Sequence, residues 1–239
     1  MQRKFLITGA SSQIGLAILK KIYSSDNEYI LQCNNSYEIL NKFLSDNSYK
    51  AQIFQVDLSK ENSIDNFCNE ISGITDFISV AGHTQTDLLP NLEDKRISDM
   101  ISVNIIAPTK ISRKIISEMS AKRYGNIVYI SSVAASRGNR GQTVYGGTKA
   151  YIESFARSLC AEFASRSIRV NCIAPGAIEA GKLNELLSYA KNEVLNEIAS
   201  KKLGTPEHVA GLVNYLLSKE AEFINGKTIT IDGGFMKGV

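Results

Sequence analysis

The stretch Thr8-Gly9-Ala10-Ser11-Ser12-Gln13-Ile14-Gly15 joins a short apolar run, residues 3–8, to a segment with helical spacing, residues 13–24. A glycine turn that leads from a strand straight into a helix points backbone N–H groups and the positive helix end at one spot. This arrangement suits a pyrophosphate at the edge of a parallel sheet, although an ordinary strand-to-helix turn uses the same residue types. The stretch therefore predicts a strand–helix unit with a candidate anion site.

The same alternation of strands and helices continues along the chain. Apolar runs rich in Ile, Val, Phe and Tyr lie at 3–8, 28–33, 51–56, 76–80, 126–131, 168–173 and 227–231. Segments with helical spacing lie at 13–24, 38–46, 61–72, 97–122, 145–165, 183–200 and 207–218. Pro206 predicts the start of the last helix, with Thr205 as its cap. This pattern predicts an α/β doubly wound Rossmann fold, with a seven-stranded parallel sheet covered by helices on both faces. We expect one domain over 1–239, with an excursion above the sheet around 176–205 that forms a lid over the substrate.

Composition excludes several classes of function. Hydrophobic residues make up 44% and charged residues 21%, which are values of a folded globular chain. The net charge of +3 gives no support to a nucleic-acid partner. No run of ~18 apolar residues exists to cross a membrane, and the opening MQRKFLITGAS has no long apolar region of a signal peptide. We therefore expect a cytoplasmic protein without a membrane partner.

The sequence lacks the residue patterns that a metal site or a hydrolase needs. The four cysteines, at positions 33, 68, 160 and 172, contain no C-x-x-C spacing, and His83 and His208 are far apart. We expect no metal site, no disulfide framework and no Ser-His-Asp hydrolase.

The end of the second strand bears on the choice of dinucleotide. NAD-binding proteins normally place an acid there for the adenosine ribose. Here Asn34 and its neighbours follow the strand, and no carboxylate appears before Glu38. Without that carboxylate a 2′-phosphate meets no repulsion, which favours NADP(H). NAD(H) stays open as the alternative, because no arginine stands beside Asn34 and a lysine such as Lys60 would have to supply the positive charge.

Tyr145 and Lys149 are the strongest candidates for chemistry. On a helix, residues four apart share a face, and an ammonium near a phenol lowers the phenol pKa. Such a tyrosine donates or accepts a proton at a reacting oxygen. The chain holds a second pair with this spacing, Tyr215 and Lys219, which we interpret as accidental. Only the first pair follows a strand that ends in serines, 131–132, at the sheet edge where ligands bind.

Weaker candidates follow other strands. Asn104 is a polar amide inside an apolar stretch, Asp57 follows the third strand, and residues 81–82 and 175–176 are turns after the fourth and sixth. Each has a structural alternative, as a helix-bonded amide, a cap or an ordinary turn.

Together and in order, these motifs resemble the short-chain dehydrogenase/reductase family over essentially the whole chain. The motifs are TGASSQIG, Asp57, SVAG, Asn104, ISS, YGGTK, APG and IDGG. The resemblance implies an NAD(P)-dependent oxidoreductase that forms a homo-oligomer, a dimer or tetramer. It implies a catalytic set of Asn104, Ser132, Tyr145 and Lys149, with Asn104 holding a water that resupplies the proton through Lys149. It implies cofactor contacts from Gly9, Ser11, Ser12, Ile14, Gly15, Asn34, Asp57, Leu58, Ala81, Gly82, Tyr145, Lys149, Pro175, Gly176 and Ile178.

Within the family, the chain is most similar to the 3-oxoacyl-acyl-carrier-protein reductases of fatty acid biosynthesis, in the segments 82–89, 123–150 and 162–179. This similarity implies NADPH-dependent reduction of a 3-oxoacyl thioester, with tyrosine as the proton donor. Arg123 and Arg166 fall where those reductases dock the acidic carrier protein. An exposed arginine pair can equally be a solvated face.

Two departures keep other functions open. Gln13 replaces the middle glycine of the family turn, and Val80 stands where the family usually has asparagine. They motivate one alternative, a cofactor-binding scaffold with little catalysis. The other alternative is a short-chain reductase or dehydrogenase of a different carbonyl or a sugar-linked substrate.

Overall fold

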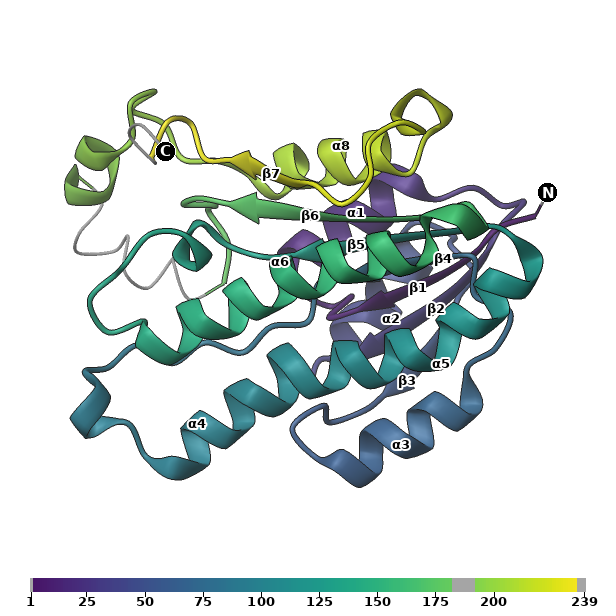
Figure 1. Cartoon of the computed structure of the whole chain (residues 1–239), viewed down its shortest axis with the longest axis horizontal. Helices are drawn as coiled ribbons and strands as arrows, with labels where there is room; N and C mark the ends of the chain where they lie inside the picture. The colour runs from purple at the N-terminus through teal and green to yellow at the C-terminus, as the bar shows by residue number, and fades with distance from the viewer. Residues whose placement is uncertain (1, 182–191, 236–239) are drawn as a thin grey trace.

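The computed structural model describes residues 2–181 and 192–235, and it has a parallel sheet between two layers of helices (Figure 1). The strand order is β3-β2-β1-β4-β5-β6-β7, and every neighbouring pair is parallel. This confirms the predicted seven-stranded Rossmann sheet. The strands are β1 (Lys4–Thr8), β2 (Glu28–Cys33), β3 (Gln52–Gln55), β4 (Asp76–Ser79), β5 (Gly125–Ile130), β6 (Ile168–Pro175) and β7 (Thr228–Ile231).

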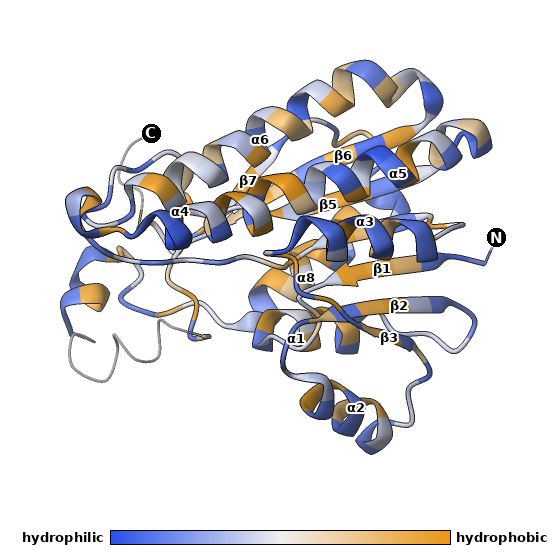
Figure 2. Cartoon of the chain, turned by 90° about the horizontal axis from the view of Figure 1, so that it is seen from below, coloured by the Kyte–Doolittle hydropathy of each residue, from blue (hydrophilic) through white to orange (hydrophobic). Residues whose placement is uncertain are grey.

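Each face of the sheet carries its own apolar core. On one face, α1 (Gln13–Ile22), α2 (Tyr37–Asp46) and α8 (Pro206–Leu216) pack on the strands. On the other face lie α3 (Glu61–Glu70), α5 (Ala107–Lys122) and α6 (Thr143–Phe163). Figure 2 shows the pattern behind this burial, because β1 and β2 are largely orange whereas the helices alternate orange with blue. Short 3-10 turns lie at η1 (Leu89–Asn91), η3 (Val133–Ala135), η4 (Ala164–Arg166) and η5 (Lys219–Ala221).

The long helix predicted over 97–122 is interrupted, which corrects that expectation. The chain forms α4 (Asp94–Ile101), a π-helical segment η2 (Ser102–Ile106) and then α5. Pro108 explains the break, because it has no N–H to donate to the carbonyl of Asn104 four residues earlier. Single π turns inside helices are frequent at functional sites. Asn104 lies buried within this one.

The start of α8 matches its sequence signals. Pro206 is the first helical residue, and Thr205 caps the helix as predicted. His208 completes the cap, because its Nδ1 accepts a hydrogen bond from the Thr205 backbone N–H at 2.9 Å. One of the two histidines therefore has a structural role.

The excursion after β6 is described only in part. Its residues 182–191, and with them the first half of the helix predicted over 183–200, lie outside the described residues, while 192–197 are helical. The segment 176–181 pairs with Gly204, whose N–H donates to the Ala177 carbonyl at 2.9 Å. None of the described helices is long and apolar enough to span a membrane.

Candidate active site

The carboxyl ends of the strands frame a cleft of about 480 Å³. It lies at the point where the strand order reverses, between β1 and β4, which is where open α/β sheets bind ligands. The cleft brings together eight residues that the sequence assigned to a cofactor, namely Gly9, Ser11, Ser12, Asn34, Asp57, Leu58, Ala81 and Gly82. Its other lining residues are Gln32, Ser36, Ser59, Val80, His83, Asp99 and Val103.

Glycine is needed in the turn after β1 because backbones approach closely there. Gly9 has φ +65°, and a Cβ on it would lie 2.7 Å from the Ala81 nitrogen. A Cβ on Gly15 would lie 2.5 Å from the Gly9 carbonyl oxygen. Ser12 caps α1, since its Oγ accepts from the Gly15 N–H at 3.0 Å. Ile14 lies below the turn, partly buried against the core.

Gln32 is a residue of the cleft that sequence reasoning missed. Its buried side chain accepts from the Gly9 N–H at 2.9 Å and donates to the Val56 carbonyl at 2.8 Å. It thereby ties the turn after β1 to the end of β3. The available signal was a glutamine inside an otherwise apolar strand, because a buried amide must find partners.

Asp57 accepts hydrogen bonds within a turn and also lines the cleft. Its carboxylate accepts from the Ser59 N–H at 3.0 Å and from the Ser59 hydroxyl at 2.7 Å. The Lys60 ammonium lies 3.4 Å away. Burial raises the pKa of Asp57, but these hydrogen bonds and the ammonium outweigh it and hold the pKa below its ordinary value.

Tyr145 and Lys149 lie on α6, beside the end of β5. The Lys149 Nζ is 5.7 Å from the centroid of the Tyr145 ring and donates to the Ile130 carbonyl at 2.9 Å. Only 6% of Lys149 is exposed, and this burial lowers its pKa from 10.5 to about 8. A Cβ on Gly82 would lie 3.4 Å from the same Nζ, so the lysine borders the cleft.

The effect predicted for Lys149 on Tyr145 is wrong in this structure. Burial raises the pKa of Tyr145, and a hydrogen bond with the Ser132 side chain opposes that rise. Burial is the largest cause, and the ammonium of Lys149 does not offset it. Tyr145 therefore keeps its proton at neutral pH.

The two serines after β5 have different partners. Ser131 is buried, and its hydroxyl donates to Glu153 Oε1 at 2.8 Å, also lying 3.3 Å from the Lys149 carbonyl. The Ser132 Oγ accepts from the Ala134 N–H at 3.2 Å, and the Ser132 side chain lowers the pKa of Tyr145 against the effect of burial. Of the two serines, Ser132 is therefore the one whose side chain lies near the Tyr145 phenol.

The Asn104 amide is committed to protein partners. Its Oδ1 accepts from the His83 N–H at 2.7 Å, and its Nδ2 donates to the His83 carbonyl at 2.8 Å and to Thr148 Oγ1 at 2.9 Å. The Thr148 hydroxyl in turn donates to the Tyr145 carbonyl at 2.7 Å. Both amide hydrogens are thus used, and the side chain joins the loop that follows β4 to the helix that carries Tyr145.

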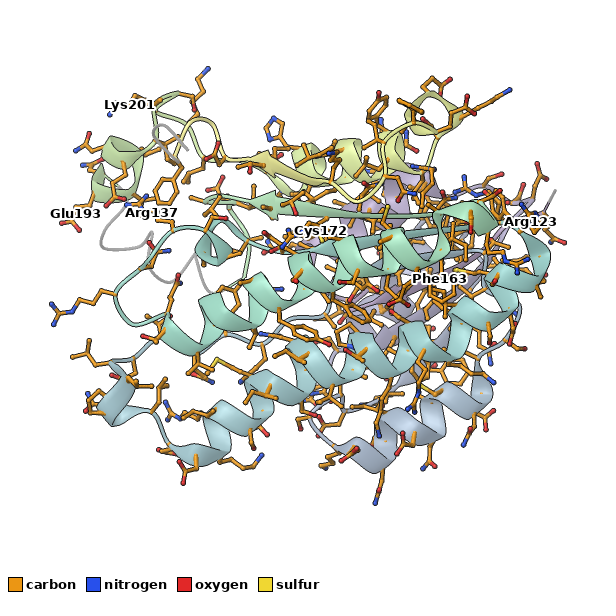
Figure 3. All side chains as sticks on the ribbon, viewed as in Figure 1. Arg123, Arg137, Phe163, Cys172, Glu193 and Lys201 are labelled. Carbon is orange, nitrogen blue, oxygen red and sulfur yellow. The ribbon has the colours of Figure 1, made fainter. Side chains whose placement is uncertain are left out.

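The remaining candidates lie at two opposite edges of the sheet. Pro175 is the last residue of β6, and Gly176 and Ile178 follow it at the carboxyl edge, outside the set that lines the cleft. Arg123 and Arg166 precede β5 and β6 at the amino edge, where Arg123 donates to the Ser165 carbonyl at 3.0 Å. Figure 3 shows Arg123 at the end of the molecule opposite Arg137, which follows β5.

Comparisons with known proteins agree with this fold. A family profile described as Enoyl-(Acyl carrier protein) reductase matches residues 9–236. Nodulation protein G of Rhizobium sp. (strain N33) is 32% identical, covering 97% of this chain and 96% of the relative. The 3-oxoacyl-[acyl-carrier-protein] reductase FabG of Rickettsia typhi is 32% identical, covering 97% and 95%. A solved structure of a putative betaketoacyl-ACP reductase superposes with a TM-score of 0.86 at 26% identity, covering 97% and 96%.

The fold and these relatives define an oxidoreductase of the Rossmann type. More narrowly, the chain belongs to the short-chain dehydrogenase/reductase family. Among the described residues, no group of three His, Cys, Asp or Glu side chains is arranged to hold a metal ion.

Proposed function

We propose that the chain is an NADPH-dependent reductase of a 3-oxoacyl thioester. The observation that carries the proposal is buried Lys149, whose Nζ lies 5.7 Å from the centroid of the Tyr145 ring and borders the cleft beside Gly82. The similarity to 3-oxoacyl-acyl-carrier-protein reductases supports the choice of substrate class.

The residues of the cleft fit a dinucleotide. Gly9, Ser11 and Ser12 surround a backbone turn that a Cβ would fill, which suits a pyrophosphate at the start of α1. Asp57 and Leu58 would flank the adenine, and Ala81, Gly82 and Lys149 the nicotinamide ribose. When bound, the reduced nicotinamide supplies the hydride for the carbonyl carbon.

The chain's own residues would manage the carbonyl oxygen. Ser132 and Tyr145 donate hydrogen bonds to it as negative charge develops, and Tyr145 then transfers its proton. Lys149 places a positive charge near the phenol. Asn104 would act as a positioning residue for α6, through Thr148.

The preference for NADPH rests on the adenosine end of the cleft. Asn34 and Ser36 line it, and no carboxylate ends β2. Asp57 is already satisfied by Ser59, and Lys60 stands beside it with a positive charge. These contacts favour a 2′-phosphate over a free 2′-hydroxyl, with NADH as the alternative cofactor.

Initial rates with an acetoacetyl thioester test the reaction, followed by loss of the reduced cofactor's absorbance. We expect turnover with NADPH and at least about tenfold lower kcat/KM with NADH, the size of effect of one charged contact. Cofactor binding without turnover of this thioester would favour a different carbonyl or sugar-linked substrate. Binding without turnover of any ketone would favour a scaffold.

Arg123 and Arg166 are the proposed docking site for an acidic carrier protein, but they lie far from the cleft of their own chain. The six residues of β5 alone separate the two edges by about 20 Å. A carrier docked there would serve the cleft of a neighbouring copy, which fits a homo-oligomer, a dimer or tetramer.

Charge reversal tests the docking site. We expect Arg123→Glu combined with Arg166→Glu to raise KM for a carrier-linked substrate about tenfold, because attraction becomes repulsion. KM for a small acetoacetyl thioester should stay unchanged. Lys50→Glu, at another exposed position, is the matched control. Equal effects of the double variant on both substrates would contradict docking.

A further inference from the structure

Gln13 uses its side chain in a way that a glycine in the family turn cannot. It is the first residue of α1, and its Oε1 accepts a hydrogen bond from the Gly181 backbone N–H at 2.7 Å. The two residues are 168 positions apart in the sequence and are both exposed. The side chain therefore leaves the turn and bonds to the segment that follows β6.

The segment 176–181 is anchored at several points. Its Glu179 N–H donates to the Gly204 carbonyl at 2.9 Å. Ile178 is buried in the apolar core that also receives Ile14 of α1 and Ala180. Gln13 adds a polar bond at the end of this segment, on the side of the cofactor turn. The two segments thus contribute to the same apolar core, and one hydrogen bond connects them at the surface.

We propose that Gln13 is a positioning residue that ties the segment 176–181 to the cofactor turn, and that this bond must open for cofactor to enter or leave. The inference rests on the proposed cofactor site. In the proposed site, a dinucleotide would extend from residues 9–15, which would hold its pyrophosphate, to a nicotinamide beside Pro175 and Gly176. The bond between Gln13 and Gly181 connects this turn to the segment 176–181, so its opening would be a step in both association and dissociation of the cofactor.

Amide exchange of the cofactor-free protein tests the bond itself. In Gln13→Ala, we expect the Gly181 amide to exchange about fivefold faster, the factor typical of one lost hydrogen bond. The Gly204 amide, bonded to Ala177, serves as an internal reference and should not change. Lys20→Ala, on the exposed face of the same helix, is the matched control. An unchanged exchange rate of the Gly181 amide in Gln13→Ala would show that the Gln13 side chain does not hold this segment.

Stopped-flow binding of NADPH and of NADH tests the effect on exchange of cofactor. In Gln13→Ala, we expect the association and dissociation rate constants both to rise about fivefold, with Kd changed less than about twofold. The fold increase in each rate constant should be the same for NADPH and NADH, because the bond between Gln13 and Gly181 lies away from the 2′-position of the adenosine ribose.

Other outcomes overturn the role in exchange. Faster dissociation alone would mean that Gln13 binds the pyrophosphate. Tighter binding by Gln13→Gly would mean that the side chain crowds the turn. A wild-type chain that binds neither cofactor would overturn the proposed function and the exchange role together, and amide exchange would still decide the tether.

Discussion

Tyr145→Phe is expected to lower kcat/KM for an acetoacetyl thioester by about 10²–10⁴-fold, the contribution of a positioned proton donor. The variant keeps the ring on α6 and loses only the phenol hydroxyl. The Kd for NADPH should stay within about twofold, since the loss is one of transition-state stabilisation. Steady-state rates and a fluorescence titration of the cofactor measure the two quantities.

The chain supplies a matched control for this variant. Tyr215 has the same spacing to Lys219, lies on α8 and is 45% exposed. Tyr215→Phe should leave turnover unchanged, because Tyr215 is not part of the proposed active site. Retention of more than about a tenth of turnover by Tyr145→Phe would remove Tyr145 from the role of acid.

The fold was accessible from the sequence because its signals are local. The apolar runs predicted at 3–8, 28–33 and 76–80 became parallel strands, since strands buried on both faces need near-continuous apolar residues. The glycine turn after Thr8 was recognisable because only glycine tolerates its close backbone approach. The same local logic placed Thr205 and Pro206 at the start of α8.

What the sequence did not show depends on contacts between distant segments. The bond from Gly181 to Gln13 needs the fold to bring the end of β6 beside α1. The raised pKa of Tyr145 depends on how deeply the phenol is buried, which the spacing to Lys149 does not express. The break at Asn104 did have a local signal, Pro108 four residues later, which the helical periodicity of 97–122 concealed.

Lys149→Met should separate catalysis from stability. The folded-state pKa of Lys149 is about 8, below its ordinary 10.5, so the folded protein disfavours the charged form. The destabilisation is therefore complete below about pH 8 and fades as pH rises toward 10.5. A methionine fills the same space without a charge, although it leaves the Ile130 carbonyl without its donor. We expect a net gain on the order of 1–2 kcal/mol in the free energy of unfolding at pH 7.

Lys149→Met should lose activity although it gains stability. We expect kcat/KM for the thioester to fall by at least about 10²-fold, because the positive charge near the phenol and a contact to the ribose are both lost. In the wild type, reduction should slow as pH rises through about 8, where Lys149 loses its proton. Urea unfolding at pH 7 and pH 10 measures the stability difference, which should shrink at the higher pH. Lys219→Met, at an exposed position, should change neither quantity. A stability difference that is equal at both pH values would show that burial of the charge is not the cause, because only a titrating group makes the difference depend on pH.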